Sequence, residues 1–155
     1  VGLVTASALL DLMPDHWIEG LVARLAQARL PFYAALNYDG HMAWSPALPH
    51  DDVVTAAFNR HQQSDKGLGP AAGPTATEVT QAAFEKAGYQ VSTADSPWSL
   101  GPKDSALQRE LLRGIANAAQ EVGETTADGW HAARLAKLPE AHATIGHTDL
   151  LAWPA

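Results

Sequence analysis

The sequence has no cysteine and few positive charges, and both shortages limit its functions. Without cysteine there is no disulfide framework, thiolate zinc site, iron–sulfur cluster or cysteine nucleophile. Lysine and arginine number 10 against 17 acidic residues, which gives a net charge of -7. The basic residues form no patch along the sequence, so binding to nucleic acid through bulk charge is disfavoured.

Long hydrophobic runs are also missing. None reaches the roughly 18 residues that a membrane-spanning helix needs, so we expect no membrane partner. A chain with 46% hydrophobic and only 17% charged residues is nevertheless too apolar to stay disordered. Its 155 residues suit one domain. We therefore expect a single folded domain over residues 1–155, located in the cytoplasm.

The first ten residues form an apolar run without polar alternation, Val1-Gly2-Leu3-Val4-Thr5-Ala6-Ser7-Ala8-Leu9-Leu10. This pattern predicts a strand buried on both faces, as in a parallel sheet that helices cover. Domains seldom begin inside their most buried strand, because termini usually lie at the surface. We therefore expect this chain to be the later part of a longer protein.

The next segments alternate between helix and strand. Helical spacing of apolar residues predicts a helix over 14–28, and an apolar run predicts a strand over 31–38. Asp39-Gly40 is a turn dipeptide, and Met42-Ala43-Trp44 would be a short hairpin return. Another helix begins at Asp51. Strand, helix and strand in this order predict a right-handed crossover between parallel strands.

The second half continues the alternation. Residues 64–74, with two prolines and three glycines, predict a loop. Thr75 and Glu78 fit a capping box that opens a helix ending at Gly88. Further patterns predict a strand over 89–93, a loop over 96–102, a helix from 104 to 123, a helix over 130–138 and a strand over 144–153. The fold class is therefore α/β.

Three patterns with known chemistry are present only in part or in the wrong context. Gly67-x-Gly69-x-x-Ala72 has the glycine spacing of a dinucleotide site, but it follows a helix instead of a strand and contains Pro70, which lacks an amide. The seven histidines do not form a known metal motif, so we expect no metal. A hydrolase using Ser7 would lack the Gly-x-Ser-x-Gly elbow.

Position within the sheet gives a better indication of the site. In open parallel sheets, ligands bind just beyond the carboxyl ends of the strands. Here these ends are Ala6 to Asp11 and Tyr38 to Gly40. Asp11 and Asp39 would be general bases or hydrogen-bond acceptors there, or they would only cap a helix and shape a turn. Further stacking and polar contacts would come from Trp44, Trp98 and the segment from His61 to Lys66.

Three segments carry a resemblance to a known family. They are Leu3-Val4-Thr5-Ala6-Ser7-Ala8-Leu9-Leu10-Asp11-Leu12 with the helix after it, Phe32-Tyr33-Ala34-Ala35-Leu36-Asn37-Tyr38-Asp39-Gly40, and Gly146-His147-Thr148-Asp149-Leu150-Leu151-Ala152. They resemble the fourth strand, the fifth strand and the last, antiparallel strand of class I S-adenosylmethionine-dependent methyltransferases. The segment from Phe58 to Pro70 resembles a bacterial, mostly uncharacterised subgroup of these enzymes.

The resemblance implies a partial doubly wound, Rossmann-like sheet with helices on both faces and with the first three strands missing. Helical insertions would lie near 46–74 and 104–138. In this family the missing strands carry the glycine-rich turn and the acidic residue that hold the cofactor. The resemblance thus implies that S-adenosylmethionine is bound by the full-length protein and not by this chain alone.

The same resemblance implies the roles of individual residues. Ala6, Ser7, Ala8 and Leu9 would border the methionine and methyl end of the cofactor, and Asp11, Tyr38, Asp39 and Trp44 would face the methyl acceptor. His61 and Lys66 complete the expected substrate contacts. No catalytic residue is assigned, because the sulfonium is an activated donor and alignment supplies most of the rate. A base such as Asp11 or His61 is needed only where the acceptor loses a proton.

Partners follow from the missing strands. The acceptor would be a small molecule or a protein side chain. The first strand would become an apolar edge and pair through Leu3 to Leu9 with a second copy of the chain or with the N-terminal segment. The alternative function is a non-catalytic α/β binding or scaffold module that acts as an oligomer.

Overall fold

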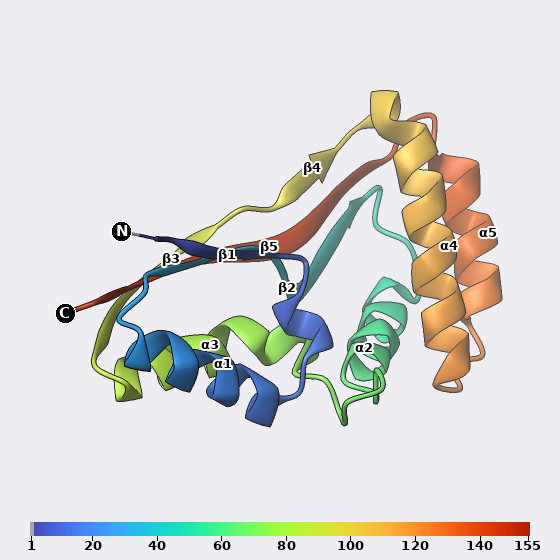
Figure 1. The fold of residues 1–155 in the computed structure, drawn as a ribbon. Coiled ribbons are helices and arrows are strands. Elements are labelled where there is room, and N and C mark those ends of the chain that lie inside the picture. The colour runs from blue at the N-terminus through green and yellow to red at the C-terminus, as the bar shows by residue number, and fades with distance from the viewer. Residues whose placement is uncertain (1) are drawn as a thin grey trace. The chain divides into compact units, whose positions relative to one another are not determined.

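The computed structural model describes residues 2–155, and it bears out most of the predicted helices and strands (Figure 1). In chain order the elements are β1 (Val4–Ser7), the 3-10 helix η1 (Leu10–Leu12), α1 (Asp15–Gln27), β2 (Phe32–Ser45), α2 (Asp51–Gln62), η2 (Gly73–Thr75), α3 (Ala76–Lys86), β3 (Tyr89–Asp95), β4 (Trp98–Leu100), η3 (Pro102–Asp104), α4 (Ser105–Glu121), α5 (Ala127–Lys137) and β5 (His142–Pro154). The expected start of the first strand on Val1 lies outside the described residues.

The chain forms two compact units. The sheet unit consists of Val1–Gly40, Gln62–Ser96 and Gly146–Ala155, and the helical unit consists of His41–His61 and Pro97–Ile145. The chain passes between them within β2 and within β5, so each of these long strands contributes to both units. The single domain expected from the sequence stays a prediction.

The sheet unit holds a mixed sheet with the strand order β1-β2-β5-β3. β1 and β2 are parallel, and β3 and β5 are antiparallel. Residues later in β2 lie beside residues earlier in β5, since Asn37 contacts Thr148 and Asp39 contacts Gly146. The two strands are therefore antiparallel. The last strand of the chain is therefore inserted antiparallel between two strands that share one direction, and the α/β class is confirmed.

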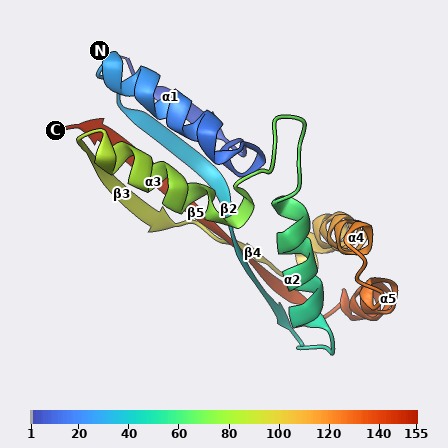
Figure 2. The same ribbon diagram turned by 90° about the horizontal axis from the view of Figure 1, so that it is seen from below.

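Both long helices of this unit lie on one face of the sheet, where α1 and α3 run side by side (Figure 2). The expectation of helices on both faces is wrong for the sheet unit. The two crossovers, from β1 to β2 and from β2 to β3, move across the sheet in the same direction. Because such connections are right-handed, both place their helix on the same face.

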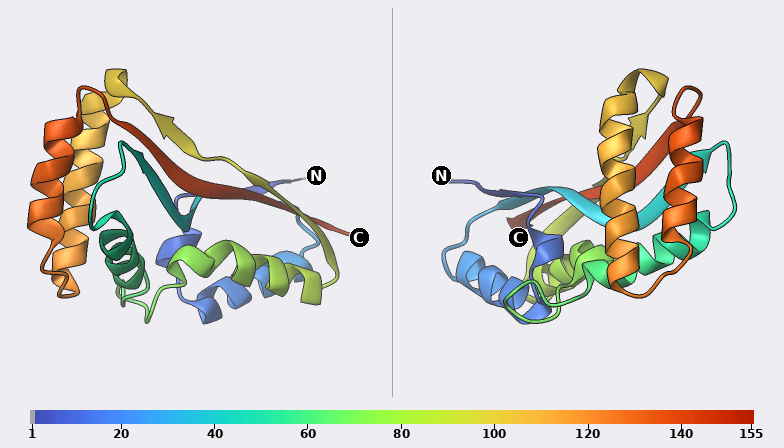
Figure 3. Two further views of the ribbon diagram at one scale, coloured as in Figure 1. Left: turned by 180° about the vertical axis from the view of Figure 1, so that it is seen from behind. Right: turned by 90° about the vertical axis from the view of Figure 1, so that its right-hand side faces the viewer.

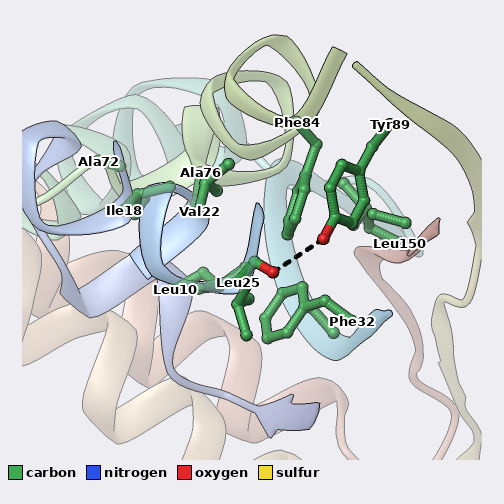
Figure 4. Packing of buried hydrophobic residues seen from close by; sticks show 12 residues of the cluster. Leu10, Ile18, Val22, Leu25, Phe32, Ala72, Ala76, Phe84, Tyr89 and Leu150 are labelled. Carbon is green, nitrogen blue, oxygen red and sulfur yellow. Dashed lines mark hydrogen bonds between the residues drawn. The ribbon is translucent and has the colours of Figure 1, made fainter. Parts of the chain in front are cut away.

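The core of the sheet unit lies between these helices and the strands (Figure 4). Phe84 of α3 stacks on Phe32 of β2 with ring centroids 5.5 Å apart, and it contacts Tyr89 at 5.0 Å. The Tyr89 hydroxyl donates to the carbonyl oxygen of Leu25 at 2.9 Å. The same carbonyl oxygen, near the end of α1, also accepts the Leu30 backbone amide at 3.0 Å, so Tyr89 adds a second donor there.

The predicted first strand is shorter and more exposed than its composition indicates. β1 has four residues, which alternate between half-buried and exposed instead of being buried on both faces. It lies at the edge of the sheet, with β2 as its neighbour. The strand ends where Ala8 takes a φ of 50°, a conformation that does not continue a strand.

The predicted turn at Asp39-Gly40 is wrong, as is the hairpin return after it. β2 continues through both residues to Ser45, and β5, its neighbour in the sheet, is of similar length. Leu36 with a φ of 56° and Gly40 with a φ of 89° change the course of the strand without ending it. A turn dipeptide thus acts here as an irregularity within one strand.

Two smaller predictions are also corrected. Thr75 forms no capping box, because its hydroxyl donates to the carbonyl oxygen of Ala72 and η2 leads directly into α3. The expected loop over 96–102 contains the short strand β4, in which Trp98 pairs with Ile145 of β5. In the helical unit, α4 and α5 pack side by side (Figure 3) and share an apolar cluster with α2.

Candidate functional site

Several polar side chains of the sheet unit lie after the end of β1, in the middle of β2 and in the part of β5 beside it. β5 runs antiparallel to β2. The first residues of β5 within this unit therefore lie at the same end of the sheet as the last residues of β1, beside the middle of β2. We refer to these residues as the strand-end cluster: Asp11, Asn37, Tyr38, Asp39, His147 and Asp149. Open α/β sheets bind their ligands beyond the carboxyl ends of parallel strands; here β1 ends at this level, whereas β2 continues to Ser45.

The Asp149 carboxylate of β5 links β2 to Ser96, the residue that follows β3. It accepts hydrogen bonds from the Tyr33 hydroxyl of β2, from the Ser96 hydroxyl at 2.7 Å and from the Leu36 backbone amide at 3.4 Å. Burial by itself raises the pKa of Asp149, but the hydrogen bonds from Tyr33 and Ser96 outweigh it and hold the pKa below its ordinary value. Leu36 is the non-glycine residue with positive φ in β2, and Asp149 holds its backbone amide.

Replacing Asp149 by asparagine tests this role. We expect the free energy of unfolding at pH 7 to fall by about 1 to 2 kcal/mol, because hydrogen bonds to a charged acceptor are replaced by neutral ones. A lowered folded-state pKa gives stability that is present above the unfolded value of about 3.9 and is lost as the pH falls through the folded-state pKa. Urea unfolding at pH 7 and pH 3 should therefore show the gap closing in acid, and an unchanged gap would contradict the assignment.

His147 is the buried histidine of the cluster. It is only 7% exposed, and its imidazole packs edge-on against Tyr38 with the ring centroids 6.3 Å apart. It also interacts electrostatically with Asp11 and with Asp149, and it lowers the pKa of each. Burial, followed by the nearby Asp39 carboxylate, raises the pKa of the Tyr38 phenol, so this group stays protonated at neutral pH.

Two oxygens of the cluster are buried without a hydrogen-bond partner in residues 2–155, namely Asp11 Oδ1 and Asn37 Oδ1. Asn37 is 1% exposed, and its amide nitrogen donates to the Thr148 carbonyl oxygen at 2.9 Å. Burial raises the pKa of Asp11, although its own backbone amide and His147 act in the opposite direction. Such buried, unpaired acceptors are uncommon in folded proteins and require an explanation.

Gly146 explains how the Asp39 carboxylate is placed. An added Cβ at Gly146 would lie 2.1 Å from Asp39 Oδ1, so any larger residue would displace that side chain. Asp39 itself is exposed and stands next to the buried Tyr38 in β2. The glycine thus lets a carboxylate lie across the β5 backbone at this edge.

The residues expected on the cofactor side follow one another at the end of β1. Ala6 and Ser7 are the last residues of this strand, Ala8 has positive φ, and Leu9 precedes η1, which carries Asp11. Ser7 and Ala8 are exposed. The chain therefore bends away from the sheet where a ligand-binding loop is expected.

Two of the expected substrate contacts belong to the helical unit. Trp44 packs edge-on against Trp130 at 5.8 Å, and the Arg134 guanidinium lies 5.2 Å from its ring centroid. His61 Nε2 is 2.7 Å from Glu121 Oε2. Both residues thus have structural contacts within their own unit.

Lys66 lies in the loop between α2 and η2 in the sheet unit. Its ammonium donates to the Ser64 hydroxyl at 3.2 Å. The neighbouring Asp65 accepts the amides of Gly67 and Gly69, which orders the glycine-rich loop and lowers the pKa of Asp65. This supports the interpretation of that segment as a turn-forming loop.

Asn37, His147 and Asp149 were not predicted as site residues. A signal was present, because Asn37 follows five apolar or aromatic residues and His147-Thr148-Asp149 interrupts an apolar strand. Polar residues inside a buried strand need partners, and the pairing of β2 with β5 supplies some of them. That pairing joins residues more than 100 positions apart and is not visible in local patterns.

Searches of the described residues for a metal site and for a membrane-spanning helix, and of known families and curated proteins for a relative, found nothing. No group of three or more histidine or acidic side chains in residues 2–155 is placed to hold a metal ion. None of the helices over the same residues has the length and apolar composition that crossing a bilayer requires. No protein-family model matches the chain, and no curated protein sequence matches it at a significant level.

Proposed function

We propose that this chain is the acceptor side of an S-adenosylmethionine-dependent methyltransferase. The observation that carries the proposal is the strand arrangement of the sheet unit. β1, α1 and β2 form a parallel crossover, and the last strand of the chain pairs antiparallel with β3. The sequence resemblance assigns these same places to the fourth, fifth and last strands of the class I methyltransferases.

The position of β1 also supports the proposal. In the family the fourth strand has a neighbour on each side, and β1 here lies at the edge of the sheet with Leu3 beside it 56% exposed. An edge strand offers unpaired backbone groups to another strand. The partner at residues 3–9 would be the segment that carries the cofactor-binding strands, or a second copy of this chain.

In the proposed site the methyl donor would lie beside Ala6, Ser7, Ala8 and Leu9. Asp11, Tyr38 and Asp39 would face the acceptor, and Lys66 of the same unit would add a contact. S-adenosylmethionine would supply an activated methyl group on a sulfonium. The residues of this chain would align the acceptor with that methyl group and exclude water, which is the effect that methyl transfer needs most.

Calorimetric titration with S-adenosylmethionine tests the proposal. This chain is compared with the product of its whole open reading frame, after the intact mass of each preparation has been measured. We expect binding by the product of the open reading frame and none by residues 1–155 alone. Binding by neither would contradict methyl transfer and favour a scaffold module, and binding by residues 1–155 would contradict the separation of the cofactor side from this chain.

A further inference from the structure

A groove lies between α1 and α3, the two helices that run side by side on the sheet (Figure 2). Its hollow measures about 550 Å³ and lies wholly within the sheet unit. Most of the side chains that line it are exposed, so the groove is open to solvent. Its apolar walls are formed by alanine and valine side chains, namely Val22, Ala23, Val79, Ala82, Ala83 and Ala87. The two helices thus present an apolar hollow to solvent.

α1 and α3 run in the same direction. Just before both helices, the Ala72 backbone amide donates to the Met13 carbonyl oxygen at 2.8 Å. Near the ends of both, the Tyr89 hydroxyl donates to the carbonyl oxygens of Leu25 and Leu30. The first turns of the two helices therefore lie at one end of the groove and their last turns at the other.

This shared direction gives the groove an acidic end and a basic end. Asp15 and Glu19 line it near the start of α1, and Glu78 lies in the first turn of α3. At the other end, Lys86 lines the groove in the last turn of α3, and Arg24 lies in the last turn of α1. None of Asp15, Glu19 and Lys86 forms an ion pair within residues 2–155. Their charges are therefore available to a partner.

Helix dipoles favour acidic residues at helix starts and basic residues at helix ends, but they do not account for the apolar hollow between the helices. We propose that this groove docks the same groove of a second copy of the chain, with the helices of the two copies running in opposite directions. A two-fold axis across the helices then places Asp15 and Glu19 of each copy opposite Lys86 of the other. With the helices of the two copies parallel, like charges would meet.

The size of the face determines how tightly two copies can bind. α1 and α3 have 13 and 11 residues, so they are about 20 and about 16 Å long. Side by side they offer roughly 400 Å² per copy, about half of what each partner buries in a standard stable interface. We therefore expect a weak dimer that dissociates on dilution. This dimer does not use residues 3–9, so it is independent of the pairing of β1 and of the proposed methyl transfer.

Sedimentation equilibrium of residues 1–155 measures the dissociation constant of the dimer. We expect Glu19→Lys and Lys86→Glu each to raise it by about tenfold or more, because each change turns two symmetric attractions into repulsions. An equal mixture of the two variants should restore the affinity to within about fivefold of that of the unmodified chain. In the mixed dimer the lysine introduced at position 19 faces the glutamate introduced at position 86, and the unchanged Glu19 faces the unchanged Lys86.

The matched control is Asp52→Lys, since Asp52 is exposed on α2 outside the sheet unit and the change in charge equals that of Glu19→Lys. It should leave the dissociation constant unchanged. A chain that stays monomeric at every concentration would overturn the proposal. A dimer that neither charge reversal weakens would also overturn it and would indicate pairing through another surface, such as residues 3–9. A mixture that binds no more tightly than either variant alone would show that these charges do not meet across a two-fold axis.

Discussion

Replacing Asp51 by alanine is expected to lower the free energy of unfolding by about 3 to 5 kcal/mol. Asp51, in the first turn of α2, forms an ion pair with Arg134 of α5, whose side chain is 1% exposed. It also accepts the Trp130 indole N–H at 2.7 Å and the Leu48 backbone amide at 2.9 Å. Removing the carboxylate leaves a buried guanidinium and a buried indole donor without their acceptor.

Urea unfolding followed by tryptophan fluorescence measures this effect, because Trp44 and Trp130 lie within the same network. The matched control is Asp52→Ala, which removes the same group from the neighbouring exposed position. A surface change of this kind alters stability by about 0.5 kcal/mol or less. A loss for Asp51→Ala no larger than that of the control would show that the buried ion pair contributes little.

The second large effect is expected in the sheet unit. Phe84 of α3 is fully buried between Phe32 and Tyr89, so replacing it by alanine removes most of an aromatic ring from the core. Changes of this type lower the free energy of unfolding by about 3 to 5 kcal/mol, through lost burial and the cavity that remains.

Two controls separate the loss of packing from a general effect of mutation. Phe84→Leu keeps most of the volume and should lower stability by about 1.5 kcal/mol. Leu107→Ala changes a side chain that is 47% exposed on α4 and should have an effect of about 0.5 kcal/mol or less. If Phe84→Ala unfolds at the same urea concentration as Phe84→Leu, the aromatic cluster is not what holds α3 on the sheet.

Local patterns were sufficient for most of the elements. The spacing of Trp17, Ile18, Leu21 and Val22 predicts a helix over 14–28, and α1 occupies Asp15–Gln27. The alternation after Gly88 predicts a strand over 89–93, and β3 occupies Tyr89–Asp95. These predictions succeed because an apolar period of 3.6 or 2 reflects which side of one element is buried.

Local patterns failed where the outcome depended on a distant strand. Asp39-Gly40 has the composition of a turn, but β2 continues past it beside β5. The run at the start of the chain has the composition of a central strand, but β1 lies at the edge. Strand composition reports how apolar a segment is, and the number of neighbours that a strand has is decided elsewhere in the chain.

The candidate site was also predicted only in part from local patterns. The rule that ligands bind beyond the carboxyl ends of parallel strands predicts Asp11, Tyr38 and Asp39 as site residues. Asp11 does follow the end of β1, in η1, but Tyr38 and Asp39 lie within β2, which continues to Ser45. His147 and Asp149 come from an antiparallel strand, to which the rule does not apply. They join the cluster because β5 is inserted beside β2.

The amino-acid sequence by itself determined the α/β class, the succession of helices and strands and the exclusion of cysteine chemistry, because each depends on composition or on short periodic patterns. Tertiary structure decided the edge position of β1, the single helical face of the sheet unit and the contact of Asn37 with Thr148. The last of these depends on the pairing of β2 with β5, which joins segments more than 100 residues apart. Such pairing is set by the packing of the whole sheet and leaves no local period in the sequence.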